Sequence, residues 1–256
     1  KAIIVVHYGG VACEMDAIMD IAKRNNLIVI EDAAQAIGAK YHQKALGSIG
    51  DLGCFSFHAT KNITAGEGGA IAINNSNYIE RAKVIHEKGT NRTNFLSGKI
   101  NKYTWIDIGS SFAPSEVTAS LLLGQLQHLD EITRYRLEAW DIYHRNFTKQ
   151  TKKSELILPV LETHASHNGH IYHIRFNSEN RRNSFIEFMH NQGIQCTFHY
   201  VPLHSAPFGA NTGRQTGDLC ETNRAAGSLA RLPIWNGIKD HQQEIVNATL
   251  NFVNGT

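Results

Sequence analysis

A lysine and an aspartate that follow predicted strands are the side chains best suited to covalent chemistry. Lys61 stands in a loop between the apolar run 52–57 and the glycine-rich turn 66–69. Asp32 closes a second apolar run, 27–30 extended by Glu31, and open α/β sheets bind ligands at the carboxyl ends of their strands. A loop lysine is usually solvated and an aspartate at a strand end usually caps a loop, so the two residues alone leave both interpretations open.

Pyridoxal phosphate (PLP) is a cofactor that would use both groups. It needs an amine that carries it as a Schiff base, a carboxylate that keeps its pyridine nitrogen protonated, and donors for its phosphate and ring hydroxyl. Lys61 offers an amine on a loop, where the side chain can alternate between carrying the cofactor and moving a proton. Asp32 offers a carboxylate on rigid structure. The two positions fit a PLP site at this sheet edge, and a solvated lysine with a capping aspartate stays open as the other interpretation.

The first half of the chain alternates strand and helix patterns. The apolar runs 2–6 and 27–30 flank an amphipathic stretch from Glu14 to Asn25, which predicts a strand-helix-strand unit of a parallel sheet. Strands are also expected at 52–57 and 70–73. A long helical pattern from about Ser115 to Phe147 is expected to connect two domains.

The second half predicts a smaller α+β domain. From about residue 155 onward, its strand signals alternate with helical ones. We predict an α/β fold with a mostly parallel sheet flanked by helices in a large domain over 1–130, and a connecting helix with the small domain over 131–256. The expected strands are 171–176 and 195–199, and the expected helices are 183–191, 221–230 and 241–252.

Composition excludes several classes of function. The 25 basic and 23 acidic residues leave a net charge of +2, so no global field favours nucleic acid or an anionic membrane. No run approaches the roughly 20 apolar residues of a membrane span, and no signal peptide opens the chain. We expect a cytoplasmic protein with reduced thiols, because the 4 cysteines form no C-x-x-C pair.

Four histidines recur at every third position, and they suggest a metal site at first sight. On a strand, a spacing of three sends successive side chains to opposite faces, so we expect no bound metal. The residues are His164, His167, His170 and His173.

Five motifs in order resemble the DegT/DnrJ/EryC1/StrS nucleotide-sugar aminotransferases. Three further segments most resemble the members that make dTDP-4-amino-4,6-dideoxygalactose for the enterobacterial common antigen. The family motifs are Val6-His7-Tyr8-Gly9-Gly10, Glu31-Asp32-Ala33-Ala34-Gln35-Ala36, Gly47-Ser48-Ile49-Gly50-Asp51, Phe55-Ser56-Phe57 before Lys61-Asn62, and Gly66-Glu67-Gly68-Gly69-Ala70. The further segments are 11–16, 89–92 and 102–111.

The resemblance implies a fold-type I PLP-dependent transferase with four cofactor residues in matching positions. Lys61 would hold PLP and transfer protons, Asp32 would pair with the pyridine nitrogen, Gln35 would lie near the ring hydroxyl, and Ser56 would bind the phosphate. Lysine at position 61 favours transamination, because related sugar dehydratases have histidine there.

Three further site residues follow from the resemblance. Many relatives have an asparagine where Ser111 stands, and the neighbouring subunit uses it to reach the phosphate, so a homodimer is expected. His199 and Tyr200 match an element near the nucleotide-sugar pocket. For these two residues, packing remains an equal alternative to substrate contact.

The implied reaction transfers an amino group from L-glutamate to the C4 ketone of dTDP-4-keto-6-deoxy-D-glucose. The product would be dTDP-4-amino-4,6-dideoxy-D-galactose for surface polysaccharide synthesis. Another nucleotide-linked keto-sugar stays open as the substrate. The chain starts at Lys1 with an apolar run, from which we expect that the family's opening segment is absent. A folded fragment without catalytic competence is therefore the other hypothesis.

Overall fold

The chain forms two compact units, each with its own hydrophobic core. The computed structural model describes residues 1–150 and 156–255. Unit 1 comprises residues 1–132 and 163–168, and unit 2 comprises residues 133–162 and 169–256. The division that the sequence predicts at residue 130 remains a prediction about the domains of the protein.

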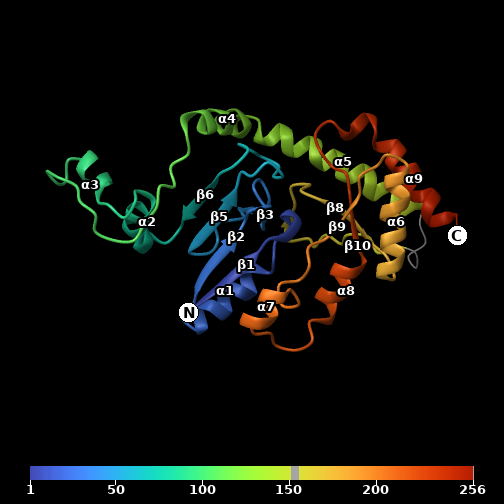
Figure 1. Ribbon diagram of the computed structural model, residues 1–256, viewed down its shortest axis with the longest axis horizontal. Helices are drawn as coiled ribbons and strands as arrows, with labels where there is room; N and C mark the ends of the chain where they lie inside the picture. The colour runs from blue at the N-terminus through green and yellow to red at the C-terminus, as the bar shows by residue number, and fades with distance from the viewer. Residues whose placement is uncertain (151–155, 256) are drawn as a thin grey trace. The chain divides into compact units, whose positions relative to one another are not determined.

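A four-stranded sheet organises unit 1, with the strand order β1-β2-β5-β6 (Figure 1). The first three strands run parallel, and the last runs antiparallel to β5. α1 connects β1 to β2, and its buried residues Met15 and Ala22 pack with Val5 and Val29 of these strands. The strands and this helix are β1 (Ala2–Val6), α1 (Met15–Arg24), β2 (Ile28–Asp32), β5 (Leu52–Ser56) and β6 (Gly69–Ile73).

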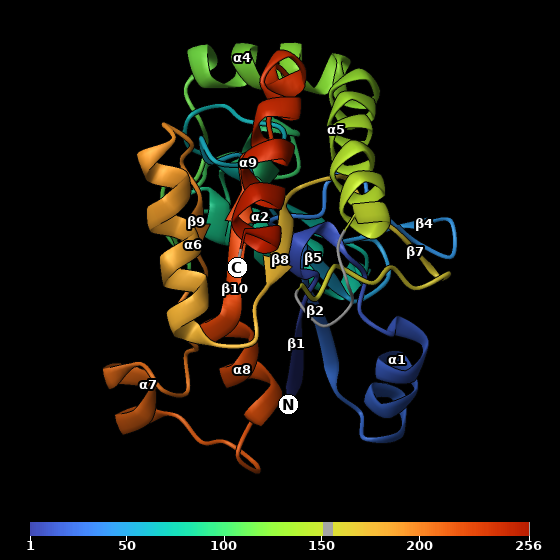
Figure 2. The same ribbon diagram turned by 90° about the vertical axis from the view of Figure 1, so that its right-hand side faces the viewer.

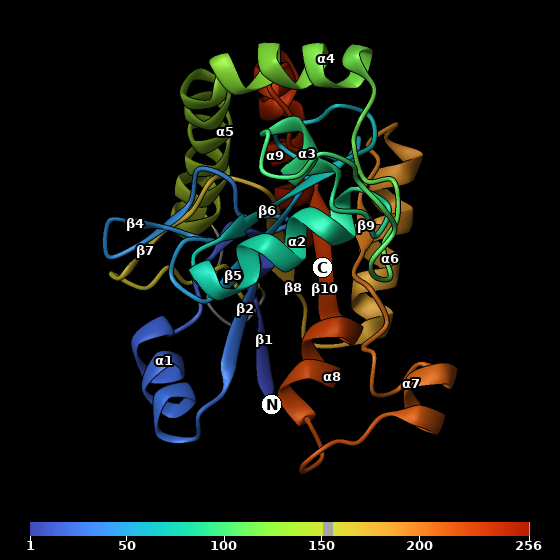
Figure 3. The same cartoon turned by 90° about the vertical axis from the view of Figure 1, so that its left-hand side faces the viewer.

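A smaller three-stranded sheet and short helices complete unit 1. The small sheet has the order β4-β3-β7, and β7 comes from the returning segment 163–168. The short helices lie in the polar connections, and α4 follows the loop 97–115 (Figure 3). The elements are η1 (Tyr8–Gly10), β3 (Lys40–Tyr41), β4 (Lys44–Ala45), η2 (Ser76–Tyr78), α2 (Ile79–His86), α3 (Arg92–Leu96), α4 (Glu116–Gln127) and β7 (Ala165–Ser166).

Unit 2 is an α+β unit around an antiparallel sheet with the order β8-β10-β9 (Figure 2). One sheet face, with Tyr172, Ile174 and Ala230, packs into a core that includes Tyr143 of α5 and Phe185 of α6. The elements are α5 (Leu129–Gln150), β8 (Tyr172–Arg175), α6 (Glu179–Asn191), β9 (Thr197–Phe198), α7 (Pro207–Thr212), α8 (Cys220–Ser228), β10 (Leu229–Leu232), η3 (Ile238–Asp240) and α9 (Gln242–Asn254).

The expected fold class is confirmed, and two expected helices differ in detail. The long helix predicted over 115–147 is interrupted at His128, whose backbone (φ −106, ψ 15) ends α4 before α5 begins. The helix predicted over 221–230 ends at Ser228, because Leu229 is extended (φ −89, ψ 132) and begins the central strand of unit 2. No helix in the described part of the chain is long and apolar enough to cross a membrane.

Candidate functional site

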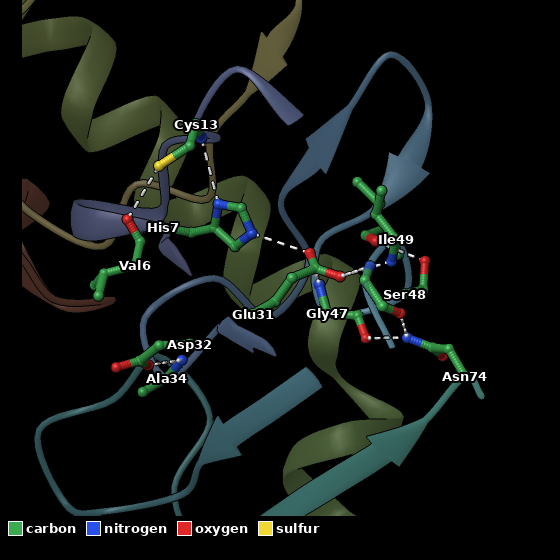
Figure 4. A network of polar contacts seen from close by, with 12 residues as sticks. Val6, His7, Cys13, Glu31, Asp32, Ala34, Gly47, Ser48, Ile49 and Asn74 are labelled. Atoms are coloured by element: carbon green, nitrogen blue, oxygen red, sulfur yellow. Dashed lines mark hydrogen bonds and ion pairs between the residues drawn. The ribbon is translucent and has the colours of Figure 1, made fainter. Parts of the chain in front are cut away.

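Asp32 and Ser56 lie at the same edge of the unit 1 sheet. They are the last residues of β2 and β5, which are adjacent parallel strands with Asp32 opposite Cys54. Both side chains are partly buried. The Oδ1 of Asp32 accepts a hydrogen bond from the Ala34 backbone N–H at 3.1 Å (Figure 4), which fixes the carboxylate at the start of the loop. The structure therefore places both residues where the sequence predicts them.

Gln35 is held by the loop that follows β1. Its Oε1 accepts a hydrogen bond from the backbone N–H of Gly9 at 2.7 Å. Gly9 adopts φ 65°, a left-handed conformation that glycine tolerates without a steric penalty. Because the oxygen is engaged, the amide nitrogen of Gln35 is the end that stays available, and it has no hydrogen-bond partner among the described residues. A donor therefore remains three residues after Asp32.

Lys61 lies in a loop that backbone hydrogen bonds close tightly. Its own N–H donates to the His58 carbonyl at 2.9 Å, and Ala65 N–H donates to the Phe57 carbonyl at 2.9 Å. The Lys61 side chain is partly buried, between the exposed Thr60 and the buried Asn62. The loop therefore fixes the backbone of Lys61 at the end of β5.

Ser56 also contacts the Lys61 loop. Its Oγ accepts a hydrogen bond from the His58 N–H at 3.3 Å. This contact uses the hydroxyl oxygen as an acceptor, so the Ser56 proton can be donated to another group.

Glu31, the residue before Asp32, forms a fully buried ion pair with His7 (Figure 4). The Nε2 of His7 and the Oε2 of Glu31 are 2.9 Å apart, and neither side chain is exposed. The Glu31 carboxylate also accepts backbone hydrogen bonds from Gly47 at 2.7 Å and from Ile49 and Gly50 at 2.6 Å. Glu31 thus joins β1, β2 and the loop 47–50 with one charged group.

The electrostatics of this pair favour its charged form. Burial raises the pKa of Glu31, but the hydrogen bonds from His7 and the backbone outweigh burial, so the pKa is lowered overall. Burial also lowers the pKa of His7, but its hydrogen bonds to Cys13 and Glu31 raise it to about 9. This shift favours the protonated form of His7 at neutral pH.

Ser111 is separate from this cluster. It is exposed, and its backbone forms an isolated bridge with Glu87. In the described part of the chain, no hydrogen bond joins Ser111 to Asp32, Gln35, Ser56 or Lys61.

His199 and Tyr200 belong to unit 2, directly after β9. They line a pocket together with Arg182, Phe198 and Asn223. Burial, together with the positive charge of Arg231, lowers the pKa of His199 to about 4, so the imidazole is neutral at physiological pH. A neutral ring can both donate and accept hydrogen bonds.

Two structural features of the site were missed by the sequence analysis. Val29 and Glu31 lie two positions apart on β2, so they share one face of the strand, and both are fully buried. This spacing indicates a buried carboxylate that needs a partner. The other feature is Asn168, a fully buried residue that contacts the Gln35 loop. Only a non-local contact reveals it, since the sequence offers no more than an Asn-Gly pair. The described residues contain no cluster of metal-binding side chains.

Comparisons with curated proteins support the sequence resemblance. The chain is 36% identical to the uncharacterized protein MJ1066 of Methanocaldococcus jannaschii over 261 residues, which cover 99% of this chain and 67% of that protein. It is 32% identical over 213 residues to a UDP-4-amino-4,6-dideoxy-N-acetyl-beta-L-altrosamine transaminase of Campylobacter jejuni, covering 81% of this chain and 54% of that protein. The chain spans between 63% and 67% of the length of the first relatives it matches.

Solved structures share the fold. The Helicobacter pylori protein PseC, described as an aminotransferase involved in the biosynthesis of pseudoaminic acid, matches with a TM-score of 0.88 and 26% identity. The match covers 100% of this chain and 67% of that one. The family model of the DegT/DnrJ/EryC1/StrS aminotransferases matches residues 1–251, and the chain belongs to this family.

Proposed function

We propose that this chain acts in a PLP-dependent aminotransferase of nucleotide sugars. The observation that carries the proposal is the position of Asp32 and Ser56 at one sheet edge, with Gln35 and Lys61 in the loops that leave this edge. Aminotransferases of the family are PLP-dependent. The family and the arrangement of these side chains support the same cofactor.

The donor set has the composition that PLP requires. Asp32 supplies a carboxylate for the pyridine nitrogen, Gln35 supplies an amide N–H for the ring hydroxyl, and Ser56 supplies a hydroxyl for the phosphate. The hydrogen bond from Gly9 supports this assignment, because it engages the Gln35 oxygen and leaves the nitrogen as the donor. When bound, PLP supplies an electron sink for the electrons released at a substrate carbon.

Lys61 would be both the attachment point and the proton carrier. Its backbone is fixed by the bond to His58, while its four-carbon side chain can move. Once released from the cofactor, the amine would be the group that takes a proton from one carbon and delivers it to another. Asp32 would face the pyridine nitrogen, and the turn bond from Ala34 fixes the orientation of its carboxylate.

For the substrates, we propose L-glutamate and the C4 ketone of dTDP-4-keto-6-deoxy-D-glucose. The segments 11–16, 89–92 and 102–111 support this narrower choice by their resemblance. The Campylobacter relative supports amination at C4, because its name specifies a 4-amino-4,6-dideoxy sugar. The same name specifies UDP, so it supports the position of the amino group and not the dTDP nucleotide.

An assay panel tests the substrate. Purified protein with PLP and L-glutamate would be offered dTDP-, UDP- and GDP-linked 4-keto-6-deoxy sugars, with product followed by mass spectrometry. We expect the dTDP sugar to have the highest kcat/KM. A preference for the UDP or GDP sugar would contradict the narrower proposal and retain the class of reaction. Absence of amination with every sugar would contradict the class itself.

His199 and Tyr200 are the residues we propose for sugar-nucleotide contact. The pocket that they line and the neutral state of His199 support hydrogen bonding to a neutral or an anionic group. We expect His199→Ala to raise KM for the sugar nucleotide and to leave KM for glutamate unchanged. Equal changes in both constants would instead indicate a packing role.

We also propose a homodimer in which Ser111 reaches the phosphate of the neighbouring subunit. The support is the exposed position of Ser111 and the resemblance of its segment. Sedimentation velocity should show a dimer. The Ser111→Ala variant should bind PLP more weakly and should still be a dimer. A monomer that binds PLP with unchanged affinity in the Ser111→Ala variant would contradict this part of the proposal.

A further inference from the structure

One buried asparagine contacts both loops of the cofactor site within unit 1. Asn168 has no exposed surface, although it ends the short segment 163–168 that returns to unit 1 from the second half of the chain. A fully buried amide is costly unless its polar atoms are bonded. Its hydrogen bonds therefore show what the residue holds in place.

The side chain of Asn168 donates two hydrogen bonds to the loop that carries Gln35. Its Nδ2 donates to the Gln35 carbonyl at 2.8 Å and to the Ile37 carbonyl at 2.9 Å. These two bonds use both amide protons, so the amide fixes the backbone on both sides of Ala36. The backbone of Gln35 determines where its side chain can reach.

The backbone of Asn168 is bonded to the loop that carries Lys61. Its carbonyl accepts a hydrogen bond from Nδ2 of Asn62 at 2.9 Å, and Asn62 is only 7% exposed. Asn62 directly follows Lys61 in the chain. Asn168 is therefore bonded to both the Gln35 loop and the Lys61 loop, and it fixes the distance between them.

Gly10 completes the contact by its lack of a side chain. A Cβ at Gly10 would collide with Oδ1 of Asn168, and Gly10 has φ 77°. The same loop supplies the Gly9 N–H that orients the Gln35 amide. Three loops thus meet at one buried asparagine.

We infer that Asn168 is a positioning residue that sets Gln35 and Lys61 at the spacing that the cofactor requires. The inference rests on the proposed function for the identity of the cofactor. Among the residues that the structure describes, Asn168 forms no hydrogen bond with the side-chain amide of Gln35 or the amine of Lys61. It acts through the backbone of Gln35 and through Asn62. Loss of the Asn168 side chain should loosen the Gln35 loop, and loss of the Asn62 side chain should loosen the Lys61 loop, in the protein without any ligand.

Hydrogen exchange of the 256-residue chain without PLP tests this coupling directly. The reporter amides are Ala36, which donates to Ala33, and Lys61, which donates to His58. We expect Asn168→Ala to speed exchange of Ala36 about tenfold or more, a factor that corresponds to the loss of about one buried hydrogen bond. Exchange of Lys61 should change little in this variant, because alanine keeps the backbone carbonyl that Asn62 contacts. A merely structural role would speed exchange uniformly over unit 1.

Asn74→Ala is the matched control. Asn74 also uses its Nδ2 to bond two backbone carbonyls, those of Gly47 at 3.1 Å and Gly50 at 2.8 Å. We expect this variant to speed exchange of Asp51, which follows the loop 47–50, and to leave Ala36 and Lys61 unchanged. Unchanged exchange at Ala36 in Asn168→Ala, or equal acceleration at Asp51 in that variant, would overturn the inference.

Asn62→Ala tests the connection to the Lys61 loop separately from the connection to the Gln35 loop. It also provides a test if Asn168→Ala does not fold. This variant removes the bond to the Lys61 loop and leaves the bonds to Gln35 and Ile37. We expect faster exchange at Lys61 and no change at Ala36. Faster exchange at both amides, or at neither, would contradict the separate connections that we infer.

A PLP titration distinguishes this inference from the proposed function. If wild-type protein binds PLP, Asn168→Ala or Asn62→Ala should raise the dissociation constant about tenfold or more, while Asn74→Ala should not. A wild-type protein that does not bind PLP would contradict the proposed function and leave the exchange result valid. PLP binding in wild type with unchanged affinity in both loop variants would contradict the positioning role alone.

Discussion

His7 and Glu31 form an ion pair with 2.9 Å between Nε2 and Oε2, and both side chains are fully buried. Glu31 directly precedes Asp32, so the pair fixes the strand end that carries the proposed cofactor carboxylate. Three backbone N–H groups share the Glu31 carboxylate. The consequence is that the geometry of the site depends on a charge that no ligand contacts.

Glu31→Gln should destabilise the protein by about 3 kcal/mol, because removal of one partner of a buried pair leaves the other charge uncompensated. The new amide group would also oppose the N–H of Gly47 or the Nε2 proton of His7. The measurement is the free energy of unfolding from urea denaturation at neutral pH, for this variant and the wild type.

Glu80→Gln is the control for that measurement. Glu80 also forms an ion pair, at 2.7 Å from Nζ of Lys83, but both side chains are exposed. Exposed pairs contribute little, so the urea midpoint should not change. An equal effect of the two variants would show that burial is not what makes the Glu31 pair important.

The pair should also give stability a defined pH range. The pKa of Glu31 is lowered from 4.5, so its contribution is present above pH 4.5 and is lost as pH falls through the lower folded value. The pKa of His7 is raised from 6.5 to about 9, so its contribution is complete below pH 6.5 and is lost as pH rises through about 9. The free energy of unfolding of the wild type relative to His7→Gln, measured from pH 4 to pH 10, should therefore be largest between about pH 4.5 and 6.5 and decline above it. A difference that is constant from pH 6 to pH 10 would show that His7 is not charged in the folded protein.

Gln35→Glu should weaken PLP binding about tenfold while it leaves folding intact. A carboxylate oxygen can still accept the Gly9 N–H, but the donor for the ring hydroxyl is lost. Gln35→Met removes both interactions, so it should weaken binding and also lower the urea midpoint. PLP affinity that is unchanged in Gln35→Glu would show that the amide nitrogen does not serve the cofactor.

The main sheet and its strand ends could be predicted because their signals are local. The apolar runs 2–6 and 27–30 each form one parallel strand, and Asp32 follows from its place at the end of such a run. The small sheet could not be predicted in this way. β3 and β7 have two residues each and pair across more than a hundred positions, which no local pattern encodes.

The candidate site shows the same division between local and non-local information. Lys61, Asp32, Gln35 and Ser56 were found from motifs within short segments. Asn168 could not be predicted, because its bonds to Gln35, Ile37 and Asn62 join residues more than a hundred positions apart. The helix predicted over 221–230 includes Leu229 and Ala230, the first two residues of β10. Their strand partners lie elsewhere in the chain, so no local pattern marks the change from helix to strand.

The residue that carries PLP tests the central claim most directly. Protein incubated with PLP would be reduced with borohydride, which makes the linkage between cofactor and lysine permanent, and then digested and mapped by mass spectrometry. We predict one modified lysine, Lys61, and no modification in Lys61→Ala, whose unfolding midpoint should match the wild type. Modification of a different lysine in the wild type, or equal modification in Lys61→Ala, would contradict the account.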